Sequence, residues 1–276
     1  MNNNIFDFNI HLPCNLTNNI NNNISNDNSM NLKELEVCYY NYFNKFNNNI
    51  NAGNFMLFNQ NIFFEDDLTT FISNVKNDFK GSLFTALIDF RKDNVLDYLN
   101  KAIINGIDCI KFHSYNQKIT ESDFTNIIKV SQYAQERNII ICIDTSYGTS
   151  KMYEYDNLKL ACHISDFITK VPIILLHTGG ARVIEAMLLA DEKKNIFLDT
   201  SFSILCYLDS SLEKDFAYTY KKIGSDRVVY GSDTPYIDIN ESLDKTIEFL
   251  DKYKFTSNEI ENILYNTASN VKKFDV

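Results

Sequence analysis

Histidines, prolines and long apolar runs are all scarce in this chain of 276 residues. No apolar run approaches the roughly 20 residues that are needed to cross a bilayer, and the first residues lack the charged and apolar regions of a secretory signal. Six cysteines are present without a CxxC spacing, and several lie in predicted strands or helices, as is typical of buried thiols in a reducing cytoplasm. We therefore expect a cytoplasmic protein without a membrane partner.

Basic residues are also in short supply, with 26 Lys and Arg against 36 Asp and Glu and a formal net charge of −10. The negative electrostatic field of such a protein repels polyphosphates, which proteins bind through stripes of Lys and Arg. We expect no nucleic-acid partner. The length and the 45% hydrophobic content favour one domain over residues 1–276. The oligomeric state is open, and a homodimer is compatible with the sequence.

An Asn-rich segment covers about residues 13–30 and is densest between Asn15 and Asn28. It is too polar to pack by itself and is interpreted as a loop. An AT-rich genome, whose codons favour Asn, would account for its composition. The sequence does not say whether this loop closes over a site.

Short apolar runs alternate with longer segments of helical period, the pattern of βαβ units on a parallel sheet. The predicted strands are Ile5–His11, Phe55–Asn59, Leu83–Asp89, Ile107–His113, Ile139–Asp144, Pro172–His177, Ile196–Thr200 and Val228–Gly231. An open doubly wound sheet has the same alternation, but it would favour a Gly-rich phosphate loop after the first strand, and none is present. We predict a closed (β/α)8 TIM barrel of the α/β class.

Helix signals fill the intervals between these strands. The clearest helical pattern runs from Glu121 to Arg137. The pairs Ser210 with Glu213 and Thr256 with Glu259 match the capping box, and Asn240 precedes a predicted helix over Glu241–Asp251. Gly106 is expected to end the helix over Asn94–Asn105.

Polar side chains at the ends of five predicted strands are the main functional signal. In the first strand, a period of two places Asp7, Asn9 and His11 on one face and Phe6, Phe8 and Ile10 on the other. The same argument aligns Lys111 with His113, while Asp144, His177 and Asp233 end or follow later strands. Buried polar groups cost free energy unless they are paired. Because barrel enzymes place their chemistry at the C-terminal ends of their strands, these groups predict a site there.

The chain has only four histidines, and three of them, His11, His113 and His177, fall at predicted strand ends. A lone histidine of this kind is more often structural, but three at equivalent positions favour a site. His163 lies inside a predicted helix over Asn157–Lys170 and keeps the structural interpretation.

Together these motifs resemble those of the amidohydrolase superfamily, in particular its amidohydrolase-related branch of mononuclear-metal decarboxylases and lactone hydrolases. The similar segments are Asp7-Phe-Asn9-Ile-His11 (family D-x-H-x-H), Gly106-Ile-Asp-Cys-Ile-Lys111-Phe-His113 (G-[IV]-x-x-[IV]-K-[FL]-H), Ile143-Asp144-Thr145 (I-H-T), His177-Thr-Gly179-Gly180 (H-x-G-G), Leu198-Asp-Thr-Ser201 (V-D-T-S), Gly231-Ser-Asp233-Thr-Pro235 (G-S-D-x-P) and Asn266-Thr-Ala-Ser-Asn-Val (N-A-x-x-[LF]). Their order and spacing cover nearly the whole chain, and the resemblance implies a barrel enzyme.

The resemblance also implies one divalent metal ion, held by both strand-1 histidines, the strand-5 histidine and the strand-8 aspartate. The corresponding residues here are Asn9, His11, Asp144 and Asp233, so two histidines are replaced. One imidazole, two carboxylates and an amide oxygen form a harder donor set, which favours Mn²⁺, Mg²⁺ or Fe²⁺ over Zn²⁺. The resemblance also includes lactone hydrolases that need no metal.

Three functions remain open at this point. The first is a metal-dependent hydrolase, in which Asp233 takes a proton from metal-bound water and His177 polarises the substrate carbonyl, or a related decarboxylase. The second is a metal-free lactone hydrolase, in which Asp233 activates water while Lys111, His113 and His177 stabilise an oxyanion. The third is an inactive barrel that binds a ligand.

For either enzyme we expect a small carboxylated lactone, amide or ester. Candidate substrate-binding residues are Asn9, Lys111, His113 and Arg182, the last of which lies just inside the helix after the sixth strand.

Overall fold

Eight strands form the centre of the computed structural model, which describes residues 4–12, 31–46, 50–148 and 150–274. They are β1 (Phe6–Leu12), β2 (Ala52–Leu57), β3 (Leu83–Leu87), β4 (Cys109–His113), β5 (Ile140–Asp144), β6 (Ile173–Leu176), β7 (Ile196–Asp199) and β8 (Val228–Val229). Each predicted strand has a counterpart, and the largest boundary difference is in β2, which begins at Ala52 rather than Phe55. The predicted Asn-rich loop over residues 13–30 lies outside the described residues.

The sheet closes into a barrel. Neighbouring strands pair in parallel in the order β1 to β8, and β1 then meets the segment at and after β8. The N–H of Phe8 donates to the Tyr230 carbonyl at 2.8 Å, and the N–H of Asp233 donates to the Asn9 carbonyl at 3.0 Å. The predicted (β/α)8 barrel is thereby confirmed, and the open doubly wound sheet is excluded.

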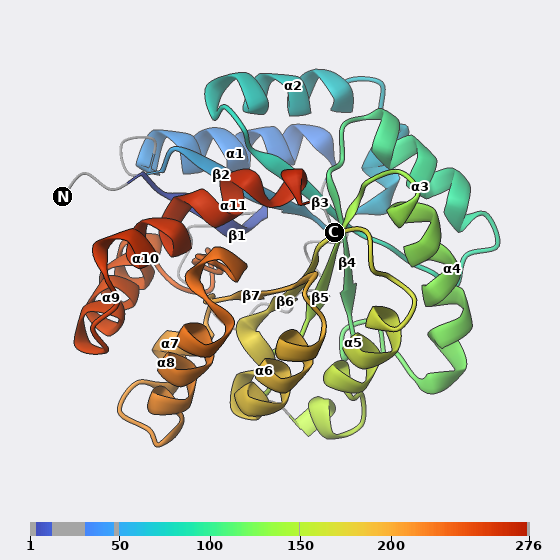
Figure 1. Cartoon of the computed structure of the whole chain (residues 1–276). Coiled ribbons are helices and arrows are strands. Elements are labelled where there is room, and N and C mark those ends of the chain that lie inside the picture. Colours follow the sequence, from blue (N-terminus) through green and yellow to red (C-terminus); the bar gives the residue numbers. More distant parts are fainter. Residues whose placement is uncertain (1–3, 13–30, 47–49, 149, 275–276) are drawn as a thin grey trace.

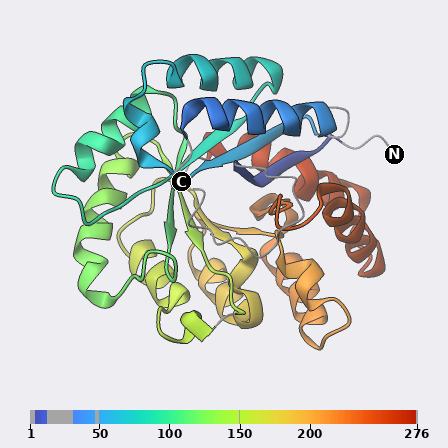
Figure 2. The same cartoon turned by 180° about the vertical axis from the view of Figure 1, so that it is seen from behind.

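Helices follow the strands around the barrel, and Figures 1 and 2 show them as a ring from both ends. They are α1 (Leu32–Phe46), α2 (Leu68–Asp78), α3 (Val95–Ile104), α4 (Phe124–Gln135), α5 (Asn157–Ser165), α6 (Val183–Glu192), α7 (Ser203–Tyr207), α8 (Leu212–Ile223), α9 (Ile239–Lys252), α10 (Ser257–Glu261) and α11 (Thr267–Asn270). Short helical turns are η2 (Gln60–Phe64), η3 (Glu121–Asp123), η4 (Ser150–Tyr153), η5 (His177–Arg182), η6 (Ser225–Arg227), η7 (Asn262–Asn266) and η8 (Val271–Lys273). None of the described helices is long and apolar enough to span a membrane.

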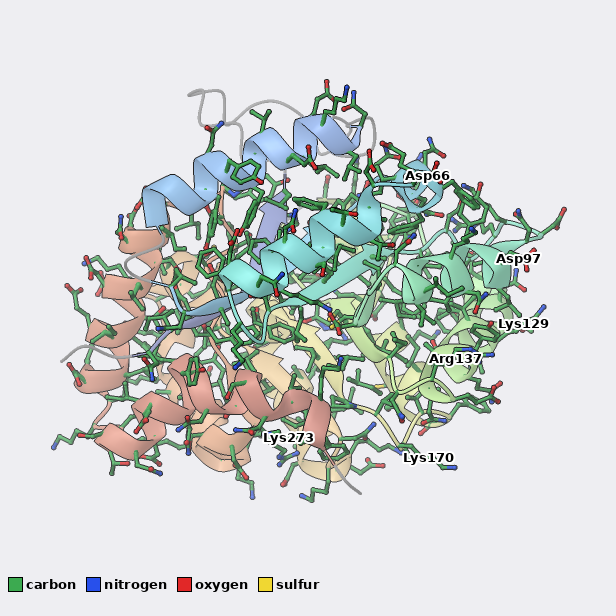
Figure 3. The ribbon with its side chains drawn as sticks, turned by 90° about the horizontal axis from the view of Figure 1, so that it is seen from above. Asp66, Asp97, Lys129, Arg137, Lys170 and Lys273 are labelled. Carbon is green, nitrogen blue, oxygen red and sulfur yellow. The ribbon has the colours of Figure 1, made fainter. Side chains whose placement is uncertain are left out.

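Alternation along the strands divides the apolar core into two layers. Ile110 and Phe112 of β4 belong to the larger cluster, which includes the helices, as predicted for this strand. Cys109 belongs to a smaller cluster that contains no residue of α1 to α10 and is therefore the barrel interior. Outside the ring, the charged side chains of Asp97 and Lys129 project away from the barrel (Figure 3).

The predicted face of β1 is wrong in one respect. Phe6 and Phe8 pack in the barrel interior, whereas Ile10 packs in the outer layer, so the three do not share a face. The cause is a shift in the register between β1 and β2, located between Asp7 and Ile10. A bulge of this kind inserts one residue and reverses the alternation after it. The first residues of β1 therefore fill the barrel interior with the rings of Phe6 and Phe8.

Two helix starts also differ from prediction. The pair Ser210 and Glu213 forms no capping box, because α8 begins at Leu212 and the Glu213 carboxylate accepts from the Asp209 N–H and from Lys252 instead. Helix α9 is capped by Asp238, whose carboxylate accepts from the N–H groups of Asn240 and Glu241, and not by Asn240. The capping box of Thr256 and Glu259 is confirmed, and Gly106 follows α3 with a φ of 101°.

The C-terminal segment covers the N-terminal ends of the strands. Ala268 and Val271 pack in the interior cluster, and Lys272 Nζ lies 2.6 Å from Asp108 Oδ1, immediately before β4. Figure 1 shows α11 crossing this end of the barrel. The opposite end, where the strands finish, carries the candidate site.

Backbone geometry after β6 is specific to glycine. Gly180 has a φ of 53° and a ψ of −126°, and a Cβ there would lie 2.6 Å from the Tyr147 backbone nitrogen. This close approach joins the segments that follow Asp144 at the end of β5 and His177 after β6.

We predict that Gly180→Ala lowers the free energy of unfolding by roughly 3 kcal/mol, because backbone strain and a backbone clash combine. Gly81 is the matched control: it has a φ of 90° but nothing within 4 Å of its Cβ position, so Gly81→Ala should cost about 1 kcal/mol. Urea denaturation measures both values. Equal losses would contradict the close approach at Gly180.

Candidate active site

Buried polar residues gather at the C-terminal ends of the strands. Lys111 and His113 lie on β4, Asp144 is the last residue of β5, His177 follows β6 and Asp199 ends β7. All of these side chains are buried, as are His11 and Asp233, which are 5% and 7% exposed as residues. The structure thus brings the predicted strand-end residues to one end of the barrel. Their chemical roles remain predictions.

The Asp144 carboxylate is the centre of one half of the site. Its Oδ2 lies 3.3 Å from Lys111 Nζ, 3.4 Å from His113 Nε2 and 3.3 Å from His177 Nε2. Its Oδ1 accepts from the Ser146 hydroxyl at 2.6 Å. Both oxygens of Asp144 therefore face proton donors.

Asp233 forms the second half with two residues of β1. Its Oδ1 lies 3.3 Å from His11 Nε2 and accepts from Asn9 Nδ2 at 3.2 Å. The ring of His11 is held edge-on between Phe58 and Tyr236, with centroid distances of 5.1 and 5.2 Å. Asn9 Oδ1 is buried and has no hydrogen-bond partner among the described residues, so it is available to a ligand.

Ser201, two residues after β7, joins the two halves. Its hydroxyl accepts from Asn9 Nδ2 at 2.9 Å, lies 3.1 Å from His177 Nδ1 and donates to Asp199 Oδ1. His177 Nδ1 also lies 3.1 Å from the Ser201 carbonyl oxygen, which can only accept. Nδ1 therefore carries a proton, and Nε2, which faces Asp144, is the nitrogen that loses its proton when the imidazolium becomes neutral.

Asp199 and Ser201 were not among the predicted site residues. Asp199 Oδ1 accepts from the backbone N–H of His177 at 2.9 Å and from that of Ser201 at 3.0 Å. Gly231 makes room for this carboxylate, because a Cβ there would lie 2.5 Å from Asp199 Oδ2. The motif Leu198-Asp-Thr-Ser201 was the available sequence signal, but it gave no indication of which groups these residues hold.

Burial and charge move the pKa values of the site in different directions. Burial alone would lower the pKa of His177, but the charge and hydrogen bond of Asp144 raise it to about 9. Burial lowers the pKa of His113 to about 3 against the opposing effect of Asp144. Burial opposes ionisation of Asp144, yet the facing His113, His177 and Lys111 hold its pKa well below the usual value. At neutral pH, His177 is a cation and His113 is neutral.

The pKa of Asp233 is also lowered. Burial raises it, but the hydrogen bond from His11 and the charge of His177 outweigh burial. Asp233 is therefore an ionised carboxylate at neutral pH, as a general base must be.

Two predicted residues lie apart from this cluster. The guanidinium of Arg182 pairs with Asp156 at 2.7 Å and with Glu185 at 2.5 Å, so its donors are directed to α5 and α6. The predicted contact of Arg182 with substrate stays a prediction. His163 lies on α5 between the rings of Phe124 and Phe167, which agrees with its structural interpretation.

The closed barrel, with acid and base groups at the ends of its strands, is that of a (β/α)8 enzyme. The amidohydrolase family profile matches residues 125–271. The chain therefore belongs to the amidohydrolase family, and the predicted resemblance is confirmed. No curated protein sequence matches the chain.

Solved structures share the fold at low sequence identity. An uncharacterised TIM-barrel protein from Bordetella bronchiseptica is 13% identical, with 97% of this chain and 98% of that chain covered and a TM-score of 0.68. A protein assigned as a 2-pyrone-4,6-dicarboxylic acid hydrolase from Acinetobacter baumannii, with citric acid bound, is 12% identical, with coverage of 98% and 100% and a TM-score of 0.62. A dihydroxybenzoic acid decarboxylase from Polaromonas sp. JS666, with bound manganese and 2-nitroresorcinol, is 10% identical, with coverage of 98% and 97% and a TM-score of 0.59.

The residues at the implied metal site do not fit a divalent ion. No group of three or more His, Cys, Asp or Glu side chains in the described part of the chain could hold one. Asn9 turns its amide N–H₂ toward Asp233, and the Lys111 ammonium lies against Asp144, so N–H donors occupy positions where a cation requires lone pairs. The predicted set of Asn9, His11, Asp144 and Asp233 is therefore not arranged as a ligand shell.

We predict opposite protonation of two histidines at pH 7, with a cationic His177 ring and a neutral His113 ring. Because the folded pKa of His177, about 9, lies above its ordinary value of 6.5, its stabilising effect is complete below pH 6.5 and is lost as the pH rises through 9. The pKa of His113 in the folded protein is about 3, so burial of its neutral ring does not lower stability above pH 6.5. As the pH falls from 6.5 toward 3, the unfolded chain binds a proton at His113 that the folded protein does not bind, and stability is lost.

Long-range ¹H–¹⁵N NMR spectra of histidine-labelled protein measure these states, and four histidines keep the spectrum simple. Each histidine is assigned by its substitution with Gln. His163, which lies outside the site, is the internal control. A neutral His177 ring at pH 7 would show that Asp144 does not govern its ionisation.

Proposed function

We propose that this protein hydrolyses a small carboxylated lactone, ester or amide, with Asp233 activating water directly. The observation that carries the proposal is the pairing of an ionised Asp233 beside His11 with two cations, Lys111 and His177, on the other half of the same site. One half can accept a proton and the other can stabilise negative charge. Hydrolysis requires both.

The reaction follows from these groups. Asp233 takes a proton from water as the water oxygen attacks the carbonyl carbon. Negative charge then develops on the carbonyl oxygen, where the His177 imidazolium and the Lys111 ammonium can stabilise it. The carbon–oxygen or carbon–nitrogen bond breaks as the intermediate collapses, and the proton on Asp233 passes to the leaving group. The products are an acid and an alcohol or amine, and Asp233 is ionised again.

The carboxylated substrate class is supported by unused donors. Lys111 Nζ makes an ion-pair contact with Asp144 but no hydrogen bond among the described residues, and an ammonium has three N–H groups. Asn9 Oδ1 remains as an acceptor for a substrate hydroxyl or for the attacking water. In this proposal His113, neutral and buried, contributes a hydrogen bond rather than a charge.

The metal-dependent mechanism expected from the family is not favoured, because the amide N–H₂ of Asn9 and the ammonium of Lys111 face the carboxylates that would have to bind the metal. An inactive binding barrel would agree with the replacement of two histidines, but it gives no role to the ionised Asp233 beside His11. A related decarboxylation would use the same cations to bind the substrate carboxylate, but it gives Asp233 no water to activate. Hydrolysis is therefore the reaction that uses all of the groups.

We predict that Asp233→Asn lowers kcat/KM by about 10³-fold, because the general base is lost. Asn tolerates the positive φ of 62° at this position, so the fold should persist. Hydrolysis of a panel of carboxylated lactones and esters measures the loss, and Asp251→Asn on the exposed face of α9 is the matched control. Unchanged turnover in a folded Asp233→Asn variant would refute the proposed base.

We further predict that kcat/KM falls as the pH rises through about 9, because the His177 imidazolium loses its charge with a pKa of about 9. The groups that face it are Asp144 and Ser201. His177→Gln should remove this basic limb and lower the plateau. A limb of unchanged midpoint in His177→Gln would assign it to another group.

A further inference from the structure

The ammonium group of Lys111 is buried. Its side chain is 1% exposed, and Nζ lies 3.3 Å from Asp144 Oδ2 and 5.3 Å from the centroid of the Phe58 ring. Buried charges persist only when they are paired. Here the carboxylate on one side and the face of an aromatic ring on the other compensate the charge.

The partner of Lys111 is the residue at the strand-5 ligand position. Asp144 Oδ2 meets Lys111, His113 and His177, and Asp144 Oδ1 meets the hydroxyl and the backbone N–H of Ser146. A divalent ion requires carboxylate lone pairs. On Asp144 these lone pairs face N–H and O–H groups.

We propose that the ion pair between Lys111 and Asp144, which stands where the family has a metal-binding histidine, takes the place of the divalent metal and excludes it from Asp144. The exclusion follows because a second cation at Asp144 would be repelled by Lys111 and would have to displace its contact. The part of this inference that concerns catalysis rests on the proposed function. The part that concerns metal binding does not.

The test is Lys111→Met, which keeps the length of the side chain and removes the charge. We expect wild-type protein, purified without chelators, to bind Co²⁺ and Mn²⁺ only weakly at the site. Lys111→Met should bind one Co²⁺ per chain at least about tenfold more tightly, measured by isothermal titration and by the visible absorption of the bound ion. Addition of Asp144→Asn to Lys111→Met should abolish the gain.

Lys76→Met is the matched control. Lys76 Nζ lies 2.7 Å from Asp108 Oδ2 at the opposite end of the barrel, where Lys272 contacts Oδ1 of the same carboxylate. Its substitution therefore removes one of two ammonium groups from a buried carboxylate and should create no metal site. If Lys111→Met does not fold, as judged by circular dichroism, Lys111→Gln replaces it, because its amide can still donate to Asp144.

Two results would overturn the inference: a folded Lys111 variant that binds Co²⁺ no better than wild type, or stoichiometric binding of the ion at Asp144 with Lys111 in place. The proposed function fails by a different result. A wild-type protein that hydrolyses nothing, beside a Lys111→Met variant that gains the ion, would remove the hydrolase proposal and leave Lys111 as the cation.

Discussion

The buried carboxylate of Asp144 is the constraint on which the rest of the site depends. A lone carboxylate without solvent would be strongly destabilised, and this one is compensated by an ammonium and by imidazoles from β4 and from the turn after β6. The same contacts decide the protonation of His177 and His113. One residue at the end of β5 thus determines how charge is distributed across half of the site.

The second half is linked to the first through Ser201 and Asp199. The Ser201 hydroxyl contacts Asn9 on β1 and His177 after β6, while Asp199 holds the backbone of both Ser201 and His177. An arrangement in which every member is bonded is more rigid than separate pairs. The general base and the cationic groups are therefore kept in fixed relative positions by a strand that supplies no candidate catalytic group.

The sequence predicted the barrel well because its signals are local. Apolar runs marked all eight strands, and polar residues at their ends marked Lys111, His113, Asp144, His177 and Asp233. What the sequence did not show depends on contacts between distant segments. The ion pair of Arg182 with Asp156 joins the starts of α5 and α6, and the bonds of Ser201 cross from the end of β7 to β1 and to the turn after β6. Spacing along the chain carries no information about either, and a change of register has no residue signature in β1.

The extra residue in β1 lets one short strand serve two purposes. Before the shift, its alternate side chains are the rings of Phe6 and Phe8, which plug the barrel; after it, the inward position is occupied by His11, beside Asp233. In a closed sheet no neighbouring strand can slide to absorb a change of length. Because Phe8 and Asn9 together stand opposite a single residue of β2, deleting either one would leave a regular strand in the same register. Ile10 would stay beneath the helices and His11 in the site, but the barrel would lose the Phe8 ring or the site would lose the Asn9 amide.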